Sequence, residues 1–401
     1  MTAIGFFRDA HWLHRKRARA YAVMLAAGMG LALGYHWISL ALGHHPGVPA
    51  LAPGKLGPTD FLAFWSAGRL ALAGHPAAAW DLAQLAQVEH AVAAMEPRAT
   101  LAFFYPPVFL LLCLPFAALP YFAGFAAFVG VQSAALLVAL RRLLPAQAGW
   151  LPLLAFPGLL LNAATGQNGF ISAACVAAAA LLLDRRPVTG GAALGLMVFK
   201  PHLALCVPVA LLAARRWQAA VAAAATASAL LLMSWWVLGT ASYQAFLNSL
   251  PQVRDALDNH REDWGKLQSI FTTVRLAGAP LAAAYVVQGI LAAGVVIWLA
   301  RLCWRRPGAG AEMAALGTAA LLCTPHVLDY DLAITGVPLA WIAGRAAGSG
   351  WRPWEKSVAG AAYIWPLLAR IATQDAHLAI GPFVLLGLLL LVARRAAEMP
   401  A

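Results

Sequence analysis

The sequence predicts an all-α, polytopic membrane protein. Of its 401 residues, 62% are hydrophobic and only 11% are charged. A soluble domain carries about a quarter of charged residues, because its surface must stay hydrated. Apolar runs recur along the whole chain, and short clusters of basic residues separate them. These features exclude a cytosolic enzyme, a DNA-binding protein and a disordered scaffold, and they favour a single membrane domain over residues 1–401.

The apolar runs give the expected membrane segments. A helix needs about 20 apolar residues to cross roughly 30 Å of hydrocarbon, so we expect roughly 10–13 segments, some of them short or re-entrant. The first run is too long for a signal-peptide core and is predicted to be a retained transmembrane helix. The runs cover residues 20–42, 104–118, 121–140, 150–163, 168–183, 188–199, 201–213, 217–238, 280–300, 312–324, 331–344, 357–371 and 379–393.

The basic clusters predict the orientation, because positively charged residues accumulate on the cytoplasmic side. The N-terminus is then cytoplasmic, and two long polar loops, 43–102 and 239–279, face outward. The net charge of +12 therefore reflects topology and not a nucleic-acid partner. One conflict remains: if 104–118 and 121–140 both cross, one arginine pair lies outside, and a re-entrant first segment is the alternative. The clusters are Arg141-Arg142, Arg185-Arg186, Arg215-Arg216, Arg305-Arg306, Arg345 with Arg352, and Arg394-Arg395.

Two stretches are predicted to be pairs of half-length helices that meet at a polar tip. Residues 184–216 have arginines at both ends and Lys200-Pro201-His202 in the middle. Residues 150–183 repeat this plan, with Asn162 and Gly166-Gln167-Asn168 at the tip. Broken helices with polar tips occur where the backbone lines a protected cavity.

Asp60 is the first candidate for chemistry. It precedes an apolar segment over 61–72, which is expected to form an amphipathic helix on the outer interface. One role for Asp60 is the N-cap of that helix. The other is a carboxylate at the water–lipid boundary that acts as general base on a hydroxyl. The two roles are compatible.

Lys200 is the only lysine deep in an apolar run. A cation within the bilayer costs a few kcal/mol or more unless it is paired or hydrated. Lys200 either extends to the outer interface or binds an anionic phosphate, with His202 assisting. Both readings stay open on the sequence alone.

The segment around His326 is the third candidate. A single histidine between apolar helices is often structural, but Tyr330 and Asp331 nearby favour a site. Asp329-Tyr330-Asp331 has the D-x-D form of metal-dependent nucleotide-sugar enzymes, yet those motifs lie on soluble sheet domains. Metal binding is the weaker interpretation.

Polar and aromatic residues supply further candidates. Gln167 and Asn168 either form a simple turn or contact sugar hydroxyls. Tyr105 and Tyr330 either stack on a sugar or belong to an interfacial aromatic belt. The sequence lacks a Walker loop, a strand-preceded G-x-G-x-x-G and H-E-x-x-H, so no cofactor and no metal are predicted.

Short motifs, in order over roughly residues 58–335, resemble those of glycosyltransferase family 87. The resemblance implies a GT-C fold and a mannosyltransferase that uses a polyprenyl-phosphate mannose donor on the outer face of a bacterial-type inner membrane. The motifs are Asp60-Phe61 through Gly68-Arg69, Gly74-His75-Pro76, Trp80-Asp81, Phe104-Tyr105-Pro106-Pro107, Gly166-Gln167-Asn168, Phe199-Lys200-Pro201, Gln268-Ser269, Thr324-Pro325-His326 and Tyr330-Asp331.

The resemblance also suggests roles for single residues. Asp60 matches the catalytic acidic position of the first outer loop, and His326 matches an active-site histidine after a Ser/Thr-Pro pair. Thr324 stands where serine is commoner, which is a departure from the pattern. Gln167, Asn168 and Lys200 match recurrent positions whose roles we assign from chemistry.

The sequence therefore predicts an inverting, metal-independent transfer of a hexose, mannose, from polyprenyl phosphate to a hydroxyl of a lipid or glycan acceptor. Asp60 would take the hydroxyl proton, and Lys200 with His326 or Arg69 would stabilise the departing phosphate. The alternative is a flippase or transporter for a lipid or lipid-linked sugar, which broken helices also suit. The predicted catalytic residues are Asp60 and His326, and the predicted substrate-binding residues are Arg69, Tyr105, Gln167, Asn168, Lys200, His202, Tyr330 and Asp331.

Overall fold

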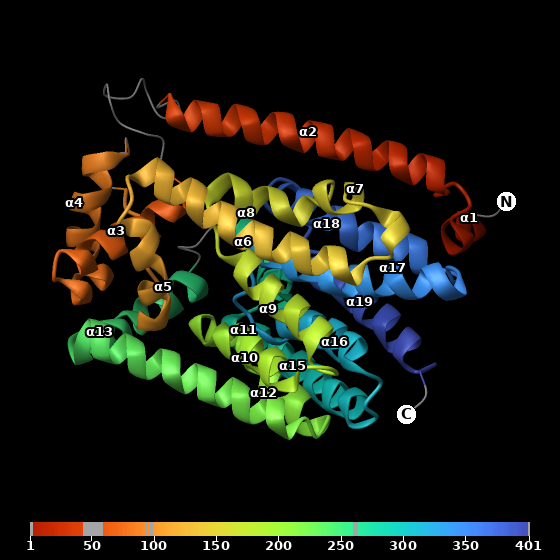
Figure 1. The fold of residues 1–401 in the computed structure, drawn as a ribbon. Helices are drawn as coiled ribbons and strands as arrows, with labels where there is room; N and C mark the ends of the chain where they lie inside the picture. Colours follow the sequence, from red (N-terminus) through yellow and green to blue (C-terminus); the bar gives the residue numbers. More distant parts are fainter. Residues whose placement is uncertain (1–2, 43–58, 94, 96–98, 260–263, 400–401) are drawn as a thin grey trace.

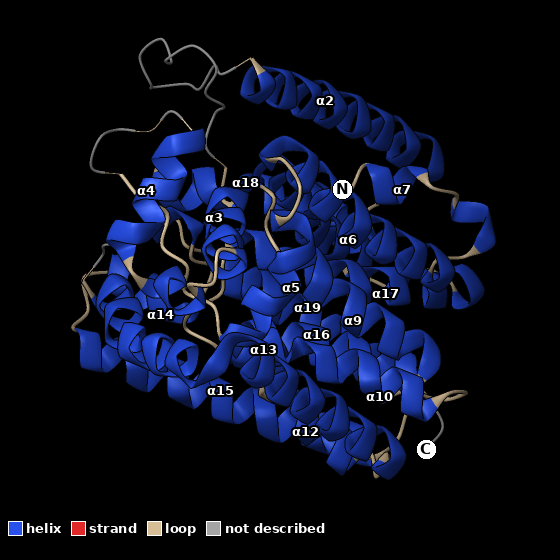
Figure 2. Cartoon of the chain, turned by 60° about the vertical axis from the view of Figure 1, so that its left-hand side comes forward, coloured by secondary structure: helices blue, strands red, loops and turns tan. Residues whose placement is uncertain are grey.

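The computed structural model of the chain describes residues 3–42, 59–93, 95, 99–259 and 264–399. Their regular structure is helical (Figures 1 and 2), apart from isolated bridge residues, among them the pair Leu267 and Leu328. The predicted all-α polytopic fold is confirmed. Residues 43–58 and 260–263, which belong to the two predicted outer loops, lie outside the described residues.

The element bounds follow, with 3-10 helices labelled η. The first part contains α1 (Ala3–Asp9), α2 (Arg15–Ala41), α3 (Phe61–Leu72), η1 (Pro76–Trp80), α4 (Leu82–Val92), α5 (Pro107–Ala117), α6 (Tyr121–Leu143), η2 (Ala146–Ala148) and α7 (Leu151–Leu154). The middle contains η3 (Pro157–Leu159), α8 (Leu160–Thr165), α9 (Gly169–Leu182), α10 (Pro187–Gly195), η4 (Leu196–Phe199), α11 (Pro201–Ala204), α12 (Cys206–Ala213) and α13 (Trp217–Asp258). The last part contains η5 (Trp264–Lys266), α14 (Ile270–Leu276), α15 (Leu281–Trp304), α16 (Ala309–Cys323), η6 (Asp329–Thr335), α17 (Gly336–Ser349), α18 (Glu355–Gln374) and α19 (Gly381–Ala396).

Helices α2, α6, α13 and α15 are long and apolar enough to cross a membrane. Much of their apolar surface is exposed, as expected for helices that face lipid. Helix α2 lies along one side of the body (Figure 1). It is joined to α8 through Trp37, whose Nε1 donates to the carbonyl of Ala163 in that helix over 3.0 Å.

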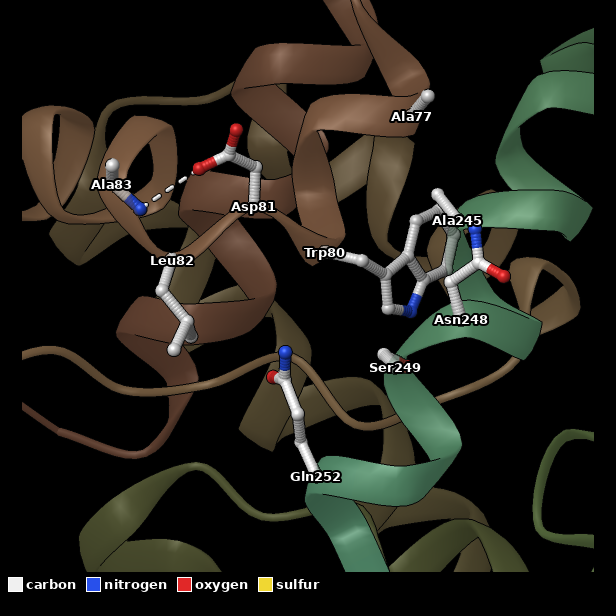
Figure 3. Close-up of a pocket in the computed structure, with 9 residues that line it drawn as sticks. All are labelled: Ala77, Trp80, Asp81, Leu82, Ala83, Ala245, Asn248, Ser249 and Gln252. Carbon is white, nitrogen blue, oxygen red and sulfur yellow. Dashed lines mark hydrogen bonds between the residues drawn. The ribbon is translucent and has the colours of Figure 1, made fainter.

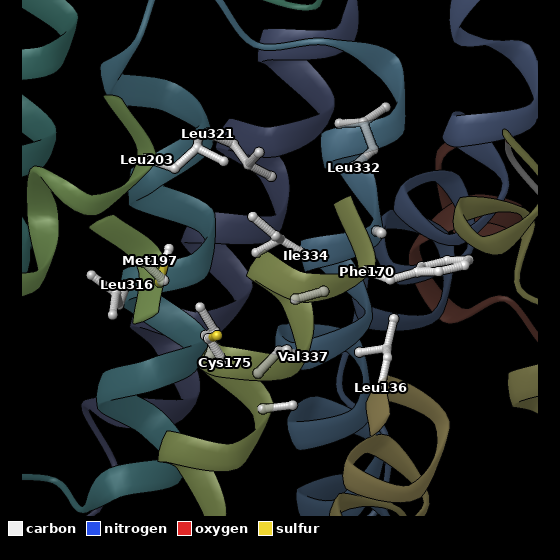
Figure 4. Packing of buried hydrophobic residues seen from close by; sticks show 14 of the residues in the cluster. Leu136, Phe170, Cys175, Met197, Leu203, Leu316, Leu321, Leu332, Ile334 and Val337 are labelled. Atoms are coloured by element: carbon white, nitrogen blue, oxygen red, sulfur yellow. The ribbon is translucent and has the colours of Figure 1, made fainter. Parts of the chain in front are cut away.

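Shorter apolar helices fill the interior between the long ones. The predicted hairpins are present: α10 with η4 and α11 with α12 meet at Lys200, and the segments α7 to α8 and α9 meet at residues 166–168. A third turn, over residues 324–335, connects α16 to α17. Figure 4 shows the apolar core that holds these elements together, with Phe170, Leu316 and Ile334 among its side chains.

Helices α10 and α13 pack closely because α10 carries Gly191 and Gly195, four residues apart. A Cβ on Gly191 would lie 2.2 Å from the carbonyl oxygen of Ala219, and one on Gly195 would lie 2.4 Å from that of Ala223. Small residues at this spacing let membrane helices approach backbone to backbone. This packing fixes the helix that leads to Lys200.

The length of α5 favours the re-entrant alternative for the first segment of the conflicting pair. This helix has 11 residues, about 17 Å at 1.5 Å per residue, which is too short to span the hydrocarbon layer. Of these two helices, only α6 is long enough to cross the membrane. The Arg141-Arg142 pair lies in its last turn, where α6 meets the C-terminal part of α17. A Cβ on Gly344 would lie 3.3 Å from the carbonyl oxygen of Leu143, so Arg142 and Arg345 share one end of the body.

Ion pairs join other basic clusters to neighbouring helix ends. Arg216 pairs with Asp184 at 2.6 Å and with Glu312 at 2.5 Å. Arg395 pairs with Glu355 at 2.6 Å. The starts of α2 and α13 and the end of α6 lie toward the right-hand side of Figure 1, and α3, α4 and α5 lie at the left.

Both predicted outer loops contain helices: the one after Asp60 is expected, and the one in the second loop is not. Helix α3 exists, but Phe61–Gly68 are all buried, so it does not lie on the interface as an amphipathic helix. Its first turns are apolar or small on every side, and Gly68 allows close contact with Ala117 of α5. Residues 240–258 continue α13 after a break at Gly239, whose φ of 76° suits only glycine.

Candidate active site

Three hairpin tips meet at Lys200. Its Nζ donates to Oδ1 of Asn168 over 2.9 Å and forms an ion pair with Oδ1 of Asp331 at 2.5 Å. The side chains of Lys200 and Asp331 are 2% and 0% exposed. A buried charge needs a partner of this kind, because desolvation otherwise costs several kcal/mol. Lys200 is thus buried and paired, so its side chain does not extend to the outer interface.

The tip at residues 166–168 is shaped by glycine and asparagine. Gly166 ends α8 with a left-handed φ of 72°. Asn162 then bridges two tips: its Oδ1 accepts from the backbone N of Gly169 over 2.8 Å, and its Nδ2 donates to the carbonyl of Tyr330 over 2.8 Å. This buried amide fixes Asn168 relative to the segment that holds Asp331.

Two tyrosines cover the ion pair. The hydroxyl oxygens of Tyr105 and Tyr330 lie 3.3 Å apart. The Nζ of Lys200 is 4.6 Å from the centre of the Tyr330 ring and 6.0 Å from that of Tyr105, distances at which a cation is attracted to an aromatic face. The two tyrosines are therefore part of the polar cluster and do not form a peripheral belt.

Asp60 stands at the N-terminal end of α3 but does not cap it. Its backbone is already helical, with φ −60° and ψ −26°, and its carboxylate makes no cap hydrogen bond. The preceding residue is anchored, since Oγ1 of Thr59 lies 2.7 Å from the hydroxyl of Tyr121. The half-buried Asp60 carboxylate is close enough to Tyr105 and Tyr330 for its charge to act on both hydroxyls.

The two predicted histidines face one another. The ring centres of His202 and His326 are 5.8 Å apart, and the rings are perpendicular. Nε2 of His202 is buried without a hydrogen-bond partner among the described residues. Because His202 follows Lys200 by two positions, the histidine pair adjoins the three tips.

The D-x-D motif is divided between two ion pairs. Asp331 pairs with Lys200, whereas Oδ2 of Asp329 accepts from Nε of Arg370 over 2.8 Å. Each carboxylate is thus directed to a different cation. Arg370 comes from α18 and has no signal in the sequence that links it to Asp329.

The amides of Gln167 and Asn168 are only partly satisfied. The backbone carbonyl of Gln167 accepts from Nε2 of Gln132 over 2.9 Å. Its own Oε1, and Nδ2 of Asn168, are buried without a partner in the described part of the chain. Buried polar atoms without partners are rare in folded proteins, and these two adjoin Lys200. They offer one acceptor and one donor to a polar ligand.

Arg69 is not brought into this cluster. It lies nine residues after Asp60, about 13 Å along a helix, and it is exposed at the end of α3. Its guanidinium lies 5.6 Å from the centre of the Trp65 ring. Lys200, Asn168, Asp331, Tyr105 and Tyr330 are linked by direct contacts, and His202 contacts His326.

Several residues outside the predicted site set hold the site, and sequence reasoning missed Gln132 and Arg370 among them. Asn162 and Gln132 fix the tip at 166–168, Arg370 neutralises Asp329, and Nε1 of Trp80 donates to the carbonyl of Tyr105 over 3.1 Å. Asn162 and Gln132 carry a usable signal, because each is an amide within an apolar run. Trp80 belongs to one of the motifs that carry the family resemblance, whereas Arg370 carries no signal, since basic residues are common near membrane ends.

Comparison with known proteins gives one match. The sequence profile of glycosyltransferase family 87 matches residues 103–325, more than half of the chain. This range includes Tyr105, Asn168 and Lys200, and it ends one residue before His326. Asp60 and Asp331 lie outside it. No curated protein and no solved structure matches the chain.

Proposed function

Since the chain belongs to glycosyltransferase family 87, we propose that it transfers mannose from a polyprenyl-phosphate donor to a hydroxyl of a lipid or glycan acceptor. The family and the long apolar helices make it a membrane glycosyltransferase. The observation that carries the finer proposal is the polar cluster of Lys200, Asp331 and Asn168, which the helical body holds beneath two tyrosines and beside a carboxylate.

The proposed reaction is a single displacement at the anomeric carbon. Asp60 accepts the proton of the acceptor hydroxyl as that oxygen forms a bond to the anomeric carbon. The bond from this carbon to the phosphate oxygen breaks on the opposite side, and its electron pair stays on the phosphate. The configuration inverts. An Asp60 carboxylate without a cap bond is suited to this role because no helix N–H group competes for its oxygens.

The structure changes the role proposed for Lys200. Its charge is already offset by Asp331 at 2.5 Å, so a phosphate would have to displace a buried partner. We assign Lys200 to positioning: it holds Asn168 and Asp331, and through them the neighbouring tips. Stabilisation of the departing phosphate then falls to the His326 and His202 pair and to the unpartnered amide of Asn168.

The orientation follows from charge. The end with the arginine pairs faces the cytoplasm under the positive-inside rule. The tips lie at the ends of the short helices α9 and α10 that are away from these arginine pairs, so in this proposal the site lies toward the outer face of a bacterial-type inner membrane. The prenyl chain of the donor would lie against these short helices, where the low dielectric strengthens the polar contacts.

The test uses protein reconstituted in vesicles with polyprenyl phosphate [³H]mannose. We expect release of polyprenyl phosphate and appearance of a labelled glycoside when a hydroxyl acceptor extract is added. Movement of intact donor between leaflets, with no cleavage of the sugar–phosphate bond, would contradict the proposal and favour a flippase. Supplying other sugars on the same lipid in parallel reactions tests the choice of mannose.

A further inference from the structure

A groove of about 420 Å³ lies between the segment that follows α3 and the second half of α13. Figure 3 shows Trp80 and Leu82 on one side and Asn248, Ser249 and Gln252 on the other. Binding sites for small molecules commonly measure about 300–1,000 Å³. The groove does not include Lys200 or either tyrosine of the candidate active site.

The lining favours a neutral ligand rich in hydroxyl groups. None of the lining residues is a cation, and Asp81 is the one acidic residue among them. Hydrogen bonds from Gln84 lower the pKa of the Asp81 carboxyl, which keeps it ionised and unfavourable to a phosphate. Asn248 and Gln252 stand one helical turn apart on one face. Their amides both donate and accept hydrogen bonds, as sugar hydroxyls do.

The groove is physically joined to the active site. Trp80, which lines it, donates from Nε1 to the carbonyl of Tyr105 over 3.1 Å. The Tyr105 hydroxyl in turn lies 3.3 Å from that of Tyr330. The 3-10 helix that ends at Trp80 also packs on α3, the helix that Asp60 precedes. A ligand in the groove therefore lies beside the elements that hold the proposed base.

Gly239 determines the position of the α13 segment that lines one side of the groove. Its φ of 76° and ψ of 166° break α13 between a first part, which packs on α10, and a second part, which packs on η1. Phe246 in this second part contacts Trp80, with ring centres 6.2 Å apart. Because of this break, the first part of α13 packs in the helical body, and the second part forms the side of the groove that carries Asn248 and Gln252.

We propose that this groove binds a sugar unit of the acceptor next to the one that carries the reacting hydroxyl. The inference rests on the proposed function and deepens it, because it makes the acceptor a glycan and not a simple lipid alcohol. Asn248 and Gln252 hydrogen-bond the sugar hydroxyls, and the edge of Trp80 contacts its C–H face.

The test is photolabelling of the full-length protein in nanodiscs. The probe is a methyl α-mannobioside that carries a diazirine on its aglycone, and peptide mass spectrometry locates the label. We expect label within residues 77–83 and 245–252, with competition by unlabelled mannobioside. The double variant Asn248→Ala/Gln252→Ala should lose about tenfold or more of this label, as expected for two lost hydrogen bonds. Gln244→Ala is the matched control, an exposed amide on the same helix outside the groove.

Three results overturn the proposal. They are undiminished label in the double variant, label confined to peptides outside the groove, and loss of label on addition of polyprenyl phosphate, which would make the groove a donor site. Asp60→Asn separates this inference from the proposed mechanism. It should abolish transfer and keep the label in the groove. If Asp60→Asn transfers at the wild-type rate and the double variant still loses the label, Asp60 is not the general base, and the groove still binds the sugar.

Discussion

Lys200 and Asp331 form a buried ion pair, with Nζ and Oδ1 2.5 Å apart. The two residues are 131 positions apart in the sequence and belong to tips of different hairpins. Asn168, from a third tip, accepts a second hydrogen bond from the same amine. One ammonium group therefore connects three turns that the short helices carry to the same place.

Removal of either partner of this pair is expected to be strongly destabilising. Lys200→Met leaves a buried carboxylate, and Asp331→Asn leaves a buried ammonium, each at a cost of about 3–5 kcal/mol. The double variant should lose less than the sum of the two single losses. Thermal unfolding in detergent, followed by circular dichroism, measures the midpoints.

The control for these single and double variants is an exposed ion pair. Arg254, which is 75% exposed, lies 3.2 Å from Asp258, and Arg254→Gln should change stability by at most about 1 kcal/mol. Additive losses from Lys200→Met and Asp331→Asn would show that the buried pair is not coupled and that the tips are held by other contacts.

Close packing of α10 on α13 gives a second prediction. Gly191→Ala introduces a methyl group 2.2 Å from the carbonyl oxygen of Ala219, so the helices must separate, at a cost of about 1–3 kcal/mol. Gly130→Ala on α6 is the control, because nothing lies within 4 Å of the added atom. It should be neutral or stabilising by up to about 1 kcal/mol. Thermal midpoints that rank the variants in the reverse order would refute this packing role.

The hairpin helices were predictable because their signals are local. Lys200 interrupts an apolar run, Pro201 follows it, and arginine pairs mark both ends, so the hairpin and its tip follow from composition and spacing. The same holds for the tip at Gly166, where a left-handed turn needs glycine. The partners of these tips were not predictable. Nothing near Asp331 indicates that it, and not Asp329, meets Lys200.

Two helices show how tertiary packing overrides a local pattern. The segment after Asp60 has the composition of an interfacial helix, yet α5 and α6 cover it, and Phe61 lies buried against Phe125 with ring centres 5.9 Å apart. Residues 240–258 contain enough polar residues to indicate a loop, yet they form a helix whose apolar side chains pack on η1. Burial of a face depends on distant segments, which spacing alone does not reveal.

Glu89 gives a prediction for pH dependence outside the membrane helices. Its buried carboxylate accepts from Oγ1 of Thr100 over 2.8 Å and from the backbone N of Leu101 over 3.0 Å. Burial nevertheless raises the pKa of this carboxyl above its ordinary value of 4.5. The folded state then binds the proton more tightly than the unfolded state, so the Glu89 contribution to the free energy of unfolding falls as pH rises from about 4.5 through the raised pKa.

Glu89→Gln removes this titration while it retains an oxygen that can accept a hydrogen bond. We expect the thermal midpoint of the variant to rise relative to that of the native protein as pH increases from 4.5. Midpoints measured at half-unit pH steps up to neutrality check this. A difference that stays constant over the series, or one that falls with pH, would contradict the assignment.

The most direct test of the account is mannosyl transfer by Asp60→Asn, measured as initial rates with labelled polyprenyl-phosphate mannose in vesicles. The variant keeps the shape of the side chain and removes the base, so turnover should fall by about 10²–10⁴-fold while the thermal midpoint stays unchanged. Asp375→Asn, an exposed carboxylate after α18, is the matched control and should transfer at the native rate. Near-native turnover by a folded Asp60→Asn protein would contradict the central claim that Asp60 is the general base.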